Sequence, residues 1–213
     1  MTEEERPEDV SRRHLPKLRQ LAISGAPAAN WPNLITIIRT AAAIVFGSVA
    51  LIQGSVTWVI TAYATYWVGD ILDGRVARWA KQETRLGAVF DILADRASSS
   101  ICICAFILIK PAFVAPLTVY WIQFMVVDAL LSCAFLHWPI LSPNYFYKVN
   151  RTVWLWNWSP PAKAANTGLL LVVLLTLPTV VALVLACLQM VLKLTSAYGV
   201  LVLATRTAPV TDG

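Results

Sequence analysis

Long apolar segments recur along this chain of 213 residues and restrict what it can fold into. An α-helix rises 1.5 Å per residue, so about 20 apolar residues cross a hydrocarbon core roughly 30 Å thick. Hydrophobic residues make up 58% of the chain and charged residues only 14%, and most charges lie between the apolar segments. The pattern therefore predicts an all-α integral membrane protein with six transmembrane helices, at about 33–53, 56–80, 85–109, 112–136, 162–178 and 180–204.

The basic residues predict how these helices are oriented. Lys and Arg gather before the first span, around the turn after the second, in the loop 137–163 and at Arg206, whereas the loops near Gln53 and Pro178 have none. Cytoplasmic loops carry an excess of Lys and Arg. We therefore expect a multi-pass protein of the plasma membrane with both termini in the cytoplasm.

The ends of the predicted spans suggest two further features. Residues 1–30 are polar and are expected to form a tail with a short interfacial helix over Val10–Ile23, followed by the membrane domain over 31–213. Tryptophan is common at membrane interfaces. Four tryptophans near predicted span ends are therefore expected to anchor the helices there: Trp31, Trp79, Trp138 and Trp158.

Four aspartates, Asp70, Asp73, Asp91 and Asp95, lie within the apolar segments and are called the aspartate cluster below. The first two are three residues apart and the last two four apart, so each pair lies on one face of its helix. If the two helices run antiparallel about a turn near 81–84, Asp73 faces Asp91 and Asp70 faces Asp95. The spacing thus predicts that the four carboxylates converge in the cytoplasmic half of the membrane.

Ionised carboxylates inside a membrane need compensating charge. A site with only oxygen ligands suits Mg²⁺ or Mn²⁺ better than zinc. Nearby, Gly74, Ala77 and Gly87 allow the close approach of a backbone or a ligand, and Arg78 can hold a phosphate. An ion pathway or a metal transporter would also place acidic residues within spans, so that alternative stays open here.

The segment reads D-x2-D-G-x2-A-R-x8-G-x3-D-x3-D from Asp70 to Asp95, and it resembles the signature of the CDP-alcohol phosphotransferase family. The resemblance implies transfer of a phosphatidyl group from CDP-diacylglycerol to an alcohol with release of CMP. It implies two divalent ions, Mg²⁺ or Mn²⁺, held by the aspartate cluster, with Asp95 also acting as the general base. The residues implied to bind the CDP-lipid are Asn33, Thr36, Asp70, Gly74, Ala77, Arg78 and Gly87.

The alcohol acceptor is predicted from weaker similarities. Residues 30–40, NWPNLITIIRT, are similar to the P-N-L-x-T-x-x-R opening of phosphatidylglycerophosphate synthases in this family. Four basic residues suit an acceptor that already carries a phosphate, such as glycerol 3-phosphate. We predict an acceptor-phosphate site from Arg39, Lys148, Arg151 and Lys163.

Other activities remain open at this stage. Many relatives of that subfamily read L-D-P-x-A-D-K around the last two aspartates, whereas this chain lacks the proline and has Arg96 in place of the lysine. Cardiolipin synthase and phosphatidylinositol phosphate synthase are therefore alternatives within the family. A metal-binding transporter or a non-catalytic relative is the alternative outside it. The expected partners are CDP-diacylglycerol, a small alcohol, the lipid bilayer and a second copy of the chain, with no nucleic acid.

Overall fold

The computed structural model describes residues 30–206, and every element in that range is helical. The all-α prediction is confirmed for this part of the chain, whereas the predicted helix over Val10–Ile23 lies outside the described residues. The elements are α2 (Trp31–Gln53), α3 (Val56–Trp79), α4 (Arg85–Ile109), η1 (Pro111–Phe113), α5 (Val114–Ile122), η2 (Gln123–Asp128), α6 (Ala129–Cys133), η3 (Ala134–His137), η4 (Pro143–Lys148), α7 (Arg151–Asn157), α8 (Pro160–Ala164), η5 (Ala165–Leu169), α9 (Leu170–Thr176) and α10 (Thr179–Arg206).

Four helical stretches within residues 30–206 are long and apolar enough to cross a membrane: Trp31–Gln53, Arg85–Ile109, Pro111–His137 and Thr179–Arg206. Large apolar side chains project from their surfaces, as expected of helices that face lipid. The other two predicted spans correspond to α3, which carries charged residues in its second half, and to the short stretch α8–η5–α9, which contains a π-helical segment. The count of six spans stays a prediction.

Capping residues determine where the helices of the site begin and end. The Asn30 side chain accepts a hydrogen bond of 3.0 Å from the Asn33 backbone at the start of α2. At its other end, α2 stops at Gly54, which has a left-handed backbone with φ of 61°. The Thr84 side chain accepts from the Gly87 backbone at 2.9 Å and begins α4. The predicted turn near 81–84 is confirmed, since it lies between α3 and α4.

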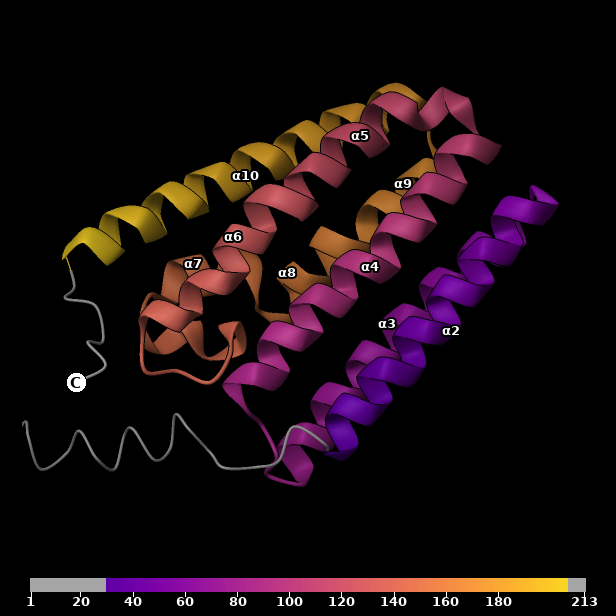
Figure 1. Cartoon of the computed structure of the whole chain (residues 1–213). Helices are drawn as coiled ribbons and strands as arrows, with labels where there is room; N and C mark the ends of the chain where they lie inside the picture. The colour runs from indigo at the N-terminus through magenta and orange to yellow at the C-terminus, as the bar shows by residue number, and fades with distance from the viewer. Residues whose placement is uncertain (1–29, 207–213) are drawn as a thin grey trace, which may run out of the picture.

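Helices α2, α3 and α4 pack closely because small residues lie between them. Figure 1 shows α2 and α3 side by side, with α4 next to them, and both helices contact α2. A Cβ atom added to Gly69 on α3 would lie 2.5 Å from the Arg39 Cβ on α2. One added to Gly47 on α2 would lie 2.7 Å from the Ile101 Cγ1 on α4. Small residues at membrane helix interfaces allow this approach.

We expect Gly69→Ala to destabilise the protein and to displace Arg39, because the added methyl group would overlap with that side chain. Overpacking of this kind typically costs about 1–3 kcal/mol. The thermal unfolding midpoint of the purified protein in detergent measures the effect. Gly199→Ala is the matched control, because a Cβ there would meet nothing within 4 Å. Equal midpoints for the two variants would contradict the close packing of α2 on α3.

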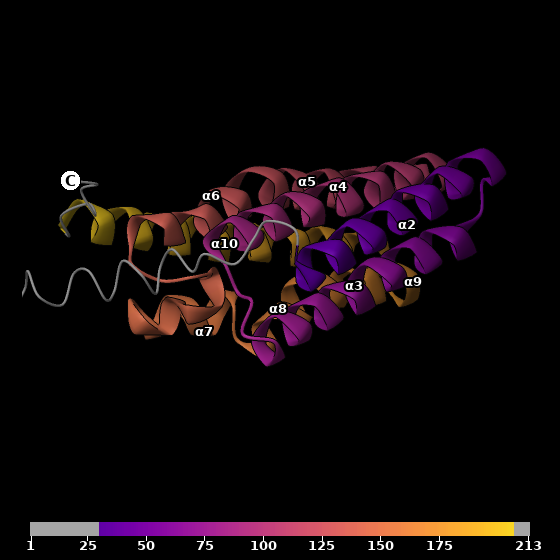
Figure 2. The ribbon, with the colours of Figure 1, turned by 60° about the horizontal axis from the view of Figure 1, so that its bottom comes forward.

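The second half of the chain is built on α10, which runs along α5 and also contacts η2, α6, α7 and α9 (Figure 1). The predicted loop 137–163 contains η4, α7 and most of α8, and α7 contacts both η4 and α10 (Figure 2). Trp138 and Trp158 hold this segment by packing on Phe146. Both tryptophans are buried, so their predicted anchoring role is wrong, whereas Trp31 and Trp79 are exposed at helix ends.

Candidate active site

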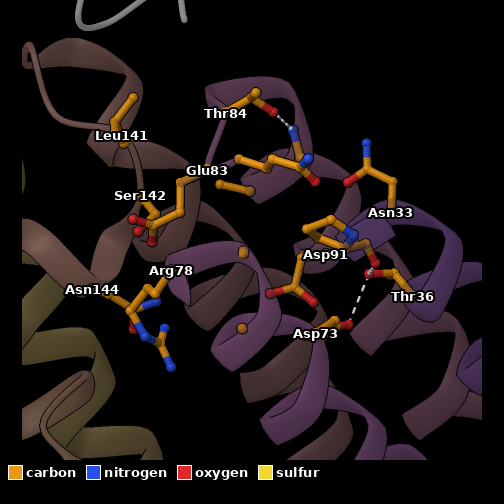
Figure 3. A pocket seen from close by; sticks show the side chains of 16 residues that line it. Asn33, Thr36, Asp73, Arg78, Glu83, Thr84, Asp91, Leu141, Ser142 and Asn144 are labelled. Carbon is orange, nitrogen blue, oxygen red and sulfur yellow. Dashed lines mark hydrogen bonds between the residues drawn. The ribbon is translucent and has the colours of Figure 1, made fainter. Parts of the chain in front are cut away.

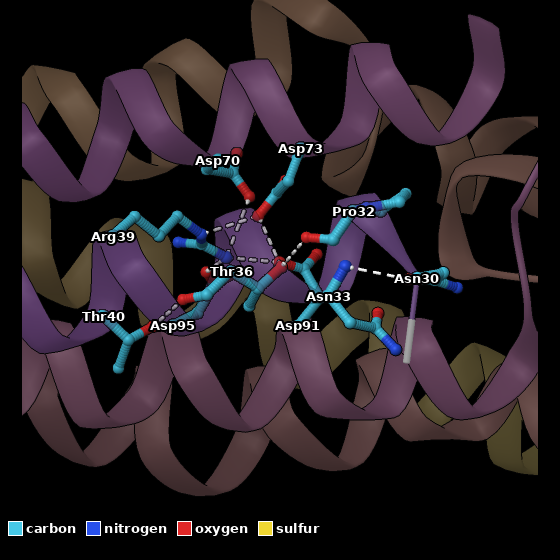
Figure 4. A network of polar contacts seen from close by, with 10 residues as sticks. All are labelled: Asn30, Pro32, Asn33, Thr36, Arg39, Thr40, Asp70, Asp73, Asp91 and Asp95. Carbon is cyan, nitrogen blue, oxygen red and sulfur yellow. Dashed lines mark hydrogen bonds and ion pairs between the residues drawn. The ribbon is translucent and has the colours of Figure 1, made fainter. Parts of the chain in front are cut away.

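The aspartate cluster surrounds the side chain of one arginine, Arg39 (Figure 4). The Arg39 Nε atom lies 2.7 Å from Asp73 Oδ2, and its Nη2 atom lies 3.1 Å from Asp95 Oδ1 and 3.8 Å from Asp70 Oδ1. Nη2 also donates to Asp91. The Thr36 hydroxyl adds a hydrogen bond of 2.7 Å to Asp73. Residues of α2, α3 and α4 thus form one polar network around the buried Arg39 side chain.

Three members of the cluster fit a divalent cation. One carboxylate oxygen each from Asp70, Asp91 and Asp95 lies within 4.8 Å of the others. The donor set consists only of carboxylate oxygens, which suits Mg²⁺ or Mn²⁺. In addition, a single guanidinium contacts four carboxylates, so the network is acidic overall. The predicted convergence of the carboxylates is confirmed for these three, whereas Asp73 joins them through Arg39.

An acceptor-phosphate residue is expected to face open space, whereas the Arg39 side chain is turned towards the aspartates. This side chain is only 2% exposed, its guanidinium lies 5.5 Å from the centre of the Tyr66 ring, and its Nε and Nη2 atoms contact the cluster. In this arrangement Arg39 acts as a counter-ion that keeps the carboxylates together. The sequence did not indicate this contact, because the loop after α2 and the first half of α3 separate α2 from the aspartate motif.

A first cavity opens on the side of the cluster that faces the turn between α3 and α4, between the start of α2, the end of α3 and the start of α4 (Figure 3). Arg78 lies on its wall, opposite Asn33 and Thr36. Gly74 and Gly87 belong to the lining, and a Cβ on Gly87 would lie 2.9 Å from Thr84 Oγ1. Of the residues predicted to bind the CDP-lipid, the first cavity brings together Asn33, Thr36, Gly74, Ala77, Arg78 and Gly87, and Asp70 is excluded.

A hydrogen bond of 2.6 Å from the Tyr145 hydroxyl to Glu83 ties the segment 141–145 to the turn beside this cavity. Burial, followed by the hydrogen bond to Glu83, raises the pKa of Tyr145 to about 12. A tyrosine in an unfolded chain has a pKa of about 10. Any stability that this raised pKa contributes is therefore present below about pH 10 and is lost as the pH rises through about 12.

We expect Tyr145→Phe to raise the KM for a substrate bound in the first cavity about two- to twelvefold, the range that net loss of one typical hydrogen bond of about 0.5–1.5 kcal/mol allows. The reason is that Leu141, Ser142 and Asn144 line the cavity and are held in place by this contact. Tyr147→Phe is the control, because Tyr147 contacts Trp154 through its ring. The same change in KM for both variants would contradict the role of the hydroxyl.

A second cavity, of about 130 Å³, lies on the other side of the cluster. Asp91, Ala88, Ser142 and Asn144 line both cavities, so the two meet at the carboxylates. Of the predicted acceptor-phosphate residues, Lys163 lines the second cavity. In the structure Lys148 packs over the Tyr145 ring, Arg151 is exposed at the start of α7, and neither belongs to the lining of the two cavities.

The second cavity also contains charged residues that sequence reasoning missed. Asp128 from η2, Lys193 from α10 and Arg96 from α4 line it together. A signal for them was present, because Asp128 and Lys193 are ionisable residues inside apolar spans and such residues are functional candidates. Their meeting could not be predicted, since they come from different helices.

Comparisons with known proteins add the final observation. A family model described as CDP-alcohol phosphatidyltransferase matches residues 29–205. The chain is 31% identical to CDP-diacylglycerol–inositol 3-phosphatidyltransferase of Drosophila melanogaster over 122 residues, which cover 56% of this chain and 50% of that protein. It is 32% identical to phosphatidylinositol phosphate synthase of Mycolicibacterium smegmatis over 78 residues, covering 37% and 35%. The matches thus span half or less of these relatives. No solved structure matches.

Proposed function

This chain belongs to the CDP-alcohol phosphatidyltransferase family, and we propose that it transfers the phosphatidyl group of CDP-diacylglycerol to a polyhydroxy alcohol of the inositol class. The observation that supports this reaction most is the meeting of two cavities at one acidic cluster. A donor in the first cavity and an acceptor in the second would meet at Asp91. The names of the two relatives favour an inositol-type acceptor.

The reaction is a displacement at phosphorus. A hydroxyl oxygen of the acceptor forms a bond to the phosphatidyl phosphorus, the bond from that phosphorus to the bridging oxygen breaks, and CMP leaves with the electron pair. Asp95 accepts the hydroxyl proton as general base. Arg78, Asn33, Thr36 and the small residues beside them hold the cytidine diphosphate group in the first cavity.

We propose that the aspartate cluster holds two divalent ions, Mg²⁺ or Mn²⁺. Bound ions would supply positive charge for the entering and leaving oxygens. Three carboxylate oxygens within 4.8 Å of one another support this proposal, as does the acidic character of the network. Arg39 would then keep the carboxylates in position, and the aspartates would hold the ions.

The membrane topology belongs to the same proposal. We propose six spans, two of which are α3 and α8–η5–α9, with both termini and the acidic cluster on the cytoplasmic side of the plasma membrane. The basic residues in the turn between α3 and α4, and in the segment before α8, support this orientation. The domain boundary near residue 30 and a homodimer are part of this proposal.

Release of CMP tests the function directly. Purified full-length protein is mixed with CDP-diacylglycerol, Mg²⁺ or Mn²⁺, and one acceptor at a time: free inositol, inositol phosphate, glycerol 3-phosphate, serine or phosphatidylglycerol. We expect metal-dependent CMP release with an inositol-class acceptor and a lipid product that contains it. Silence with every acceptor would refute the proposal and favour a non-catalytic relative.

Glycerol 3-phosphate is the second candidate acceptor. Two observations support it: the P-N-L-x-T-x-x-R segment at the start of α2, and Lys163 in the lining of the second cavity. Phosphatidylglycerophosphate as the main product of the assay would establish this candidate over the first. Product formed only with phosphatidylglycerol would indicate a cardiolipin synthase.

A further inference from the structure

A buried ionic cluster forms part of the wall of the second cavity. Asp128 Oδ2 accepts a hydrogen bond of 2.5 Å from Arg96 Nη2, and Asp128 Oδ1 accepts one of 2.5 Å from Lys193 Nζ. The exposed fractions of the three residues are 8%, 7% and 3%. Each oxygen of the carboxylate is thus used by one cation, and the three helical segments α4, η2 and α10 are joined at this point.

The two cations have little freedom to turn towards another anion. The Arg96 guanidinium also stacks on the Phe124 ring, with 4.0 Å between the guanidinium carbon and the ring centre. A hydroxyl group, that of Ser132, lies 3.4 Å from Asp128 Oδ2. Without Asp128, two buried cations would face the cavity unpaired, and such a pair would suit a phosphate dianion. With Asp128 in place, both cations are engaged and one of their two charges is cancelled.

The rest of the lining matches hydroxyl groups. Asn157 Oδ1 is a buried acceptor and Arg96 Nε a buried donor, and neither has a partner within residues 30–206. A hydroxyl can both donate and accept, whereas a phosphate dianion can only accept. Lys163, the other cation of the lining, is exposed. The uncharged polar side chains around this cavity are Gln123, Ser132, Ser142, Asn144, Asn157, Asn166 and Thr167.

We infer that the second cavity takes an acceptor alcohol without a phosphate group, an uncharged polyol, and that Asp128 determines this preference. The inference rests on the proposed function and specifies its acceptor. Asp128 acts by holding Arg96 and Lys193, so that it is a positioning residue and does not itself touch the reacting atoms. It contributes to specificity through charge, in addition to any contribution to stability.

The experiment compares kcat/KM for free inositol with that for inositol 1-phosphate, using purified full-length protein, CDP-diacylglycerol and metal. The wild type is expected to prefer free inositol. Asp128→Asn leaves both cations but removes the carboxylate charge, so the ratio of the two kcat/KM values should move at least about tenfold towards the phosphorylated acceptor. A purely structural role would lower both values equally.

A double variant provides the matched control. Asp128→Asn with Lys193→Gln removes one charge of each sign, so the net charge of the cluster returns to that of the wild type. Its acceptor ratio is expected to return towards the wild-type ratio. A ratio that stays with that of the single variant would overturn the charge argument.

The wild-type ratio tests the inference even if Asp128→Asn does not fold. Better use of inositol 1-phosphate than of free inositol by the wild type would overturn the inference and leave the proposed phosphatidyl transfer intact. The absence of CMP release with any acceptor would instead overturn the proposed function together with this inference. The two failures are therefore distinguishable in one assay.

Discussion

Asp95→Asn is expected to lower CMP release by about 10²- to 10⁴-fold, the usual contribution of a general base. The amide cannot accept the hydroxyl proton of the acceptor, but it is nearly the same size as the carboxylate. Asp95 lies at the junction of Arg39, the second cavity and the other carboxylates, where an attacking hydroxyl would be. Protection of the protein by CDP-diacylglycerol against thermal unfolding should persist, because the first cavity is unchanged.

Asp70→Asn is the comparison that separates the base from a metal ligand. This variant should also lose activity. A higher Mn²⁺ concentration should restore more of that activity than in Asp95→Asn, because Asp70→Asn lowers only the affinity for the metal. Full activity of Asp95→Asn would refute its role as base. Equal rescue of both variants by Mn²⁺ would assign Asp95 to metal binding alone.

Arg39→Gln is expected to have the largest effect on stability. Removal of one partner from a buried ion pair typically costs about 3–5 kcal/mol. This range is an upper bound here, because Asp70 and Asp91 are partly exposed, but the loss would leave four carboxylates without the guanidinium that contacts them all. With a chelator present, the unfolding midpoint in detergent should fall well below that of the wild type. Mg²⁺ or Mn²⁺ should then raise the midpoint more in the variant than in the wild type, because each ion replaces lost positive charge.

Arg39→Lys is the control that keeps the positive charge and changes the shape of the side chain. A single ammonium restores the charge, but it cannot reproduce the separate Nε and Nη2 contacts, so partial recovery of stability is expected. A metal-induced shift in Arg39→Gln no larger than that of the wild type would contradict the view that carboxylates and cations share this site.

The local features of the site could be predicted from the sequence because they depend on spacing along one hairpin. The helical periods of Asp70, Asp73, Asp91 and Asp95 and the turn between α3 and α4 follow from residues close in sequence. The same holds for Gly74, Ala77, Arg78 and Gly87, which line one cavity. The metal, catalytic and lipid-binding roles of these residues stay predictions.

Contacts between distant helices could not be predicted in the same way. Similarity over residues 30–40 predicted a phosphate-binding role for Arg39, and only the packing of α2 on α3 brings it among the carboxylates. The burial of Trp138 and Trp158 likewise depends on Phe146, to which both tryptophans pack. The segment between α6 and α8 was therefore expected to be a loop, whereas its aromatic residues fold it into short helices.

The second cavity draws on later elements of the chain more than the first cavity does. Helices α2, α3 and α4 supply the aspartates, Arg39 and most of the first cavity, whereas Asp128, Asn157, Lys163 and Lys193 come from later elements. Under the proposed function, substitutions at Asp128, Asn157 or Lys193 should therefore alter the choice of alcohol more than the chemistry at phosphorus.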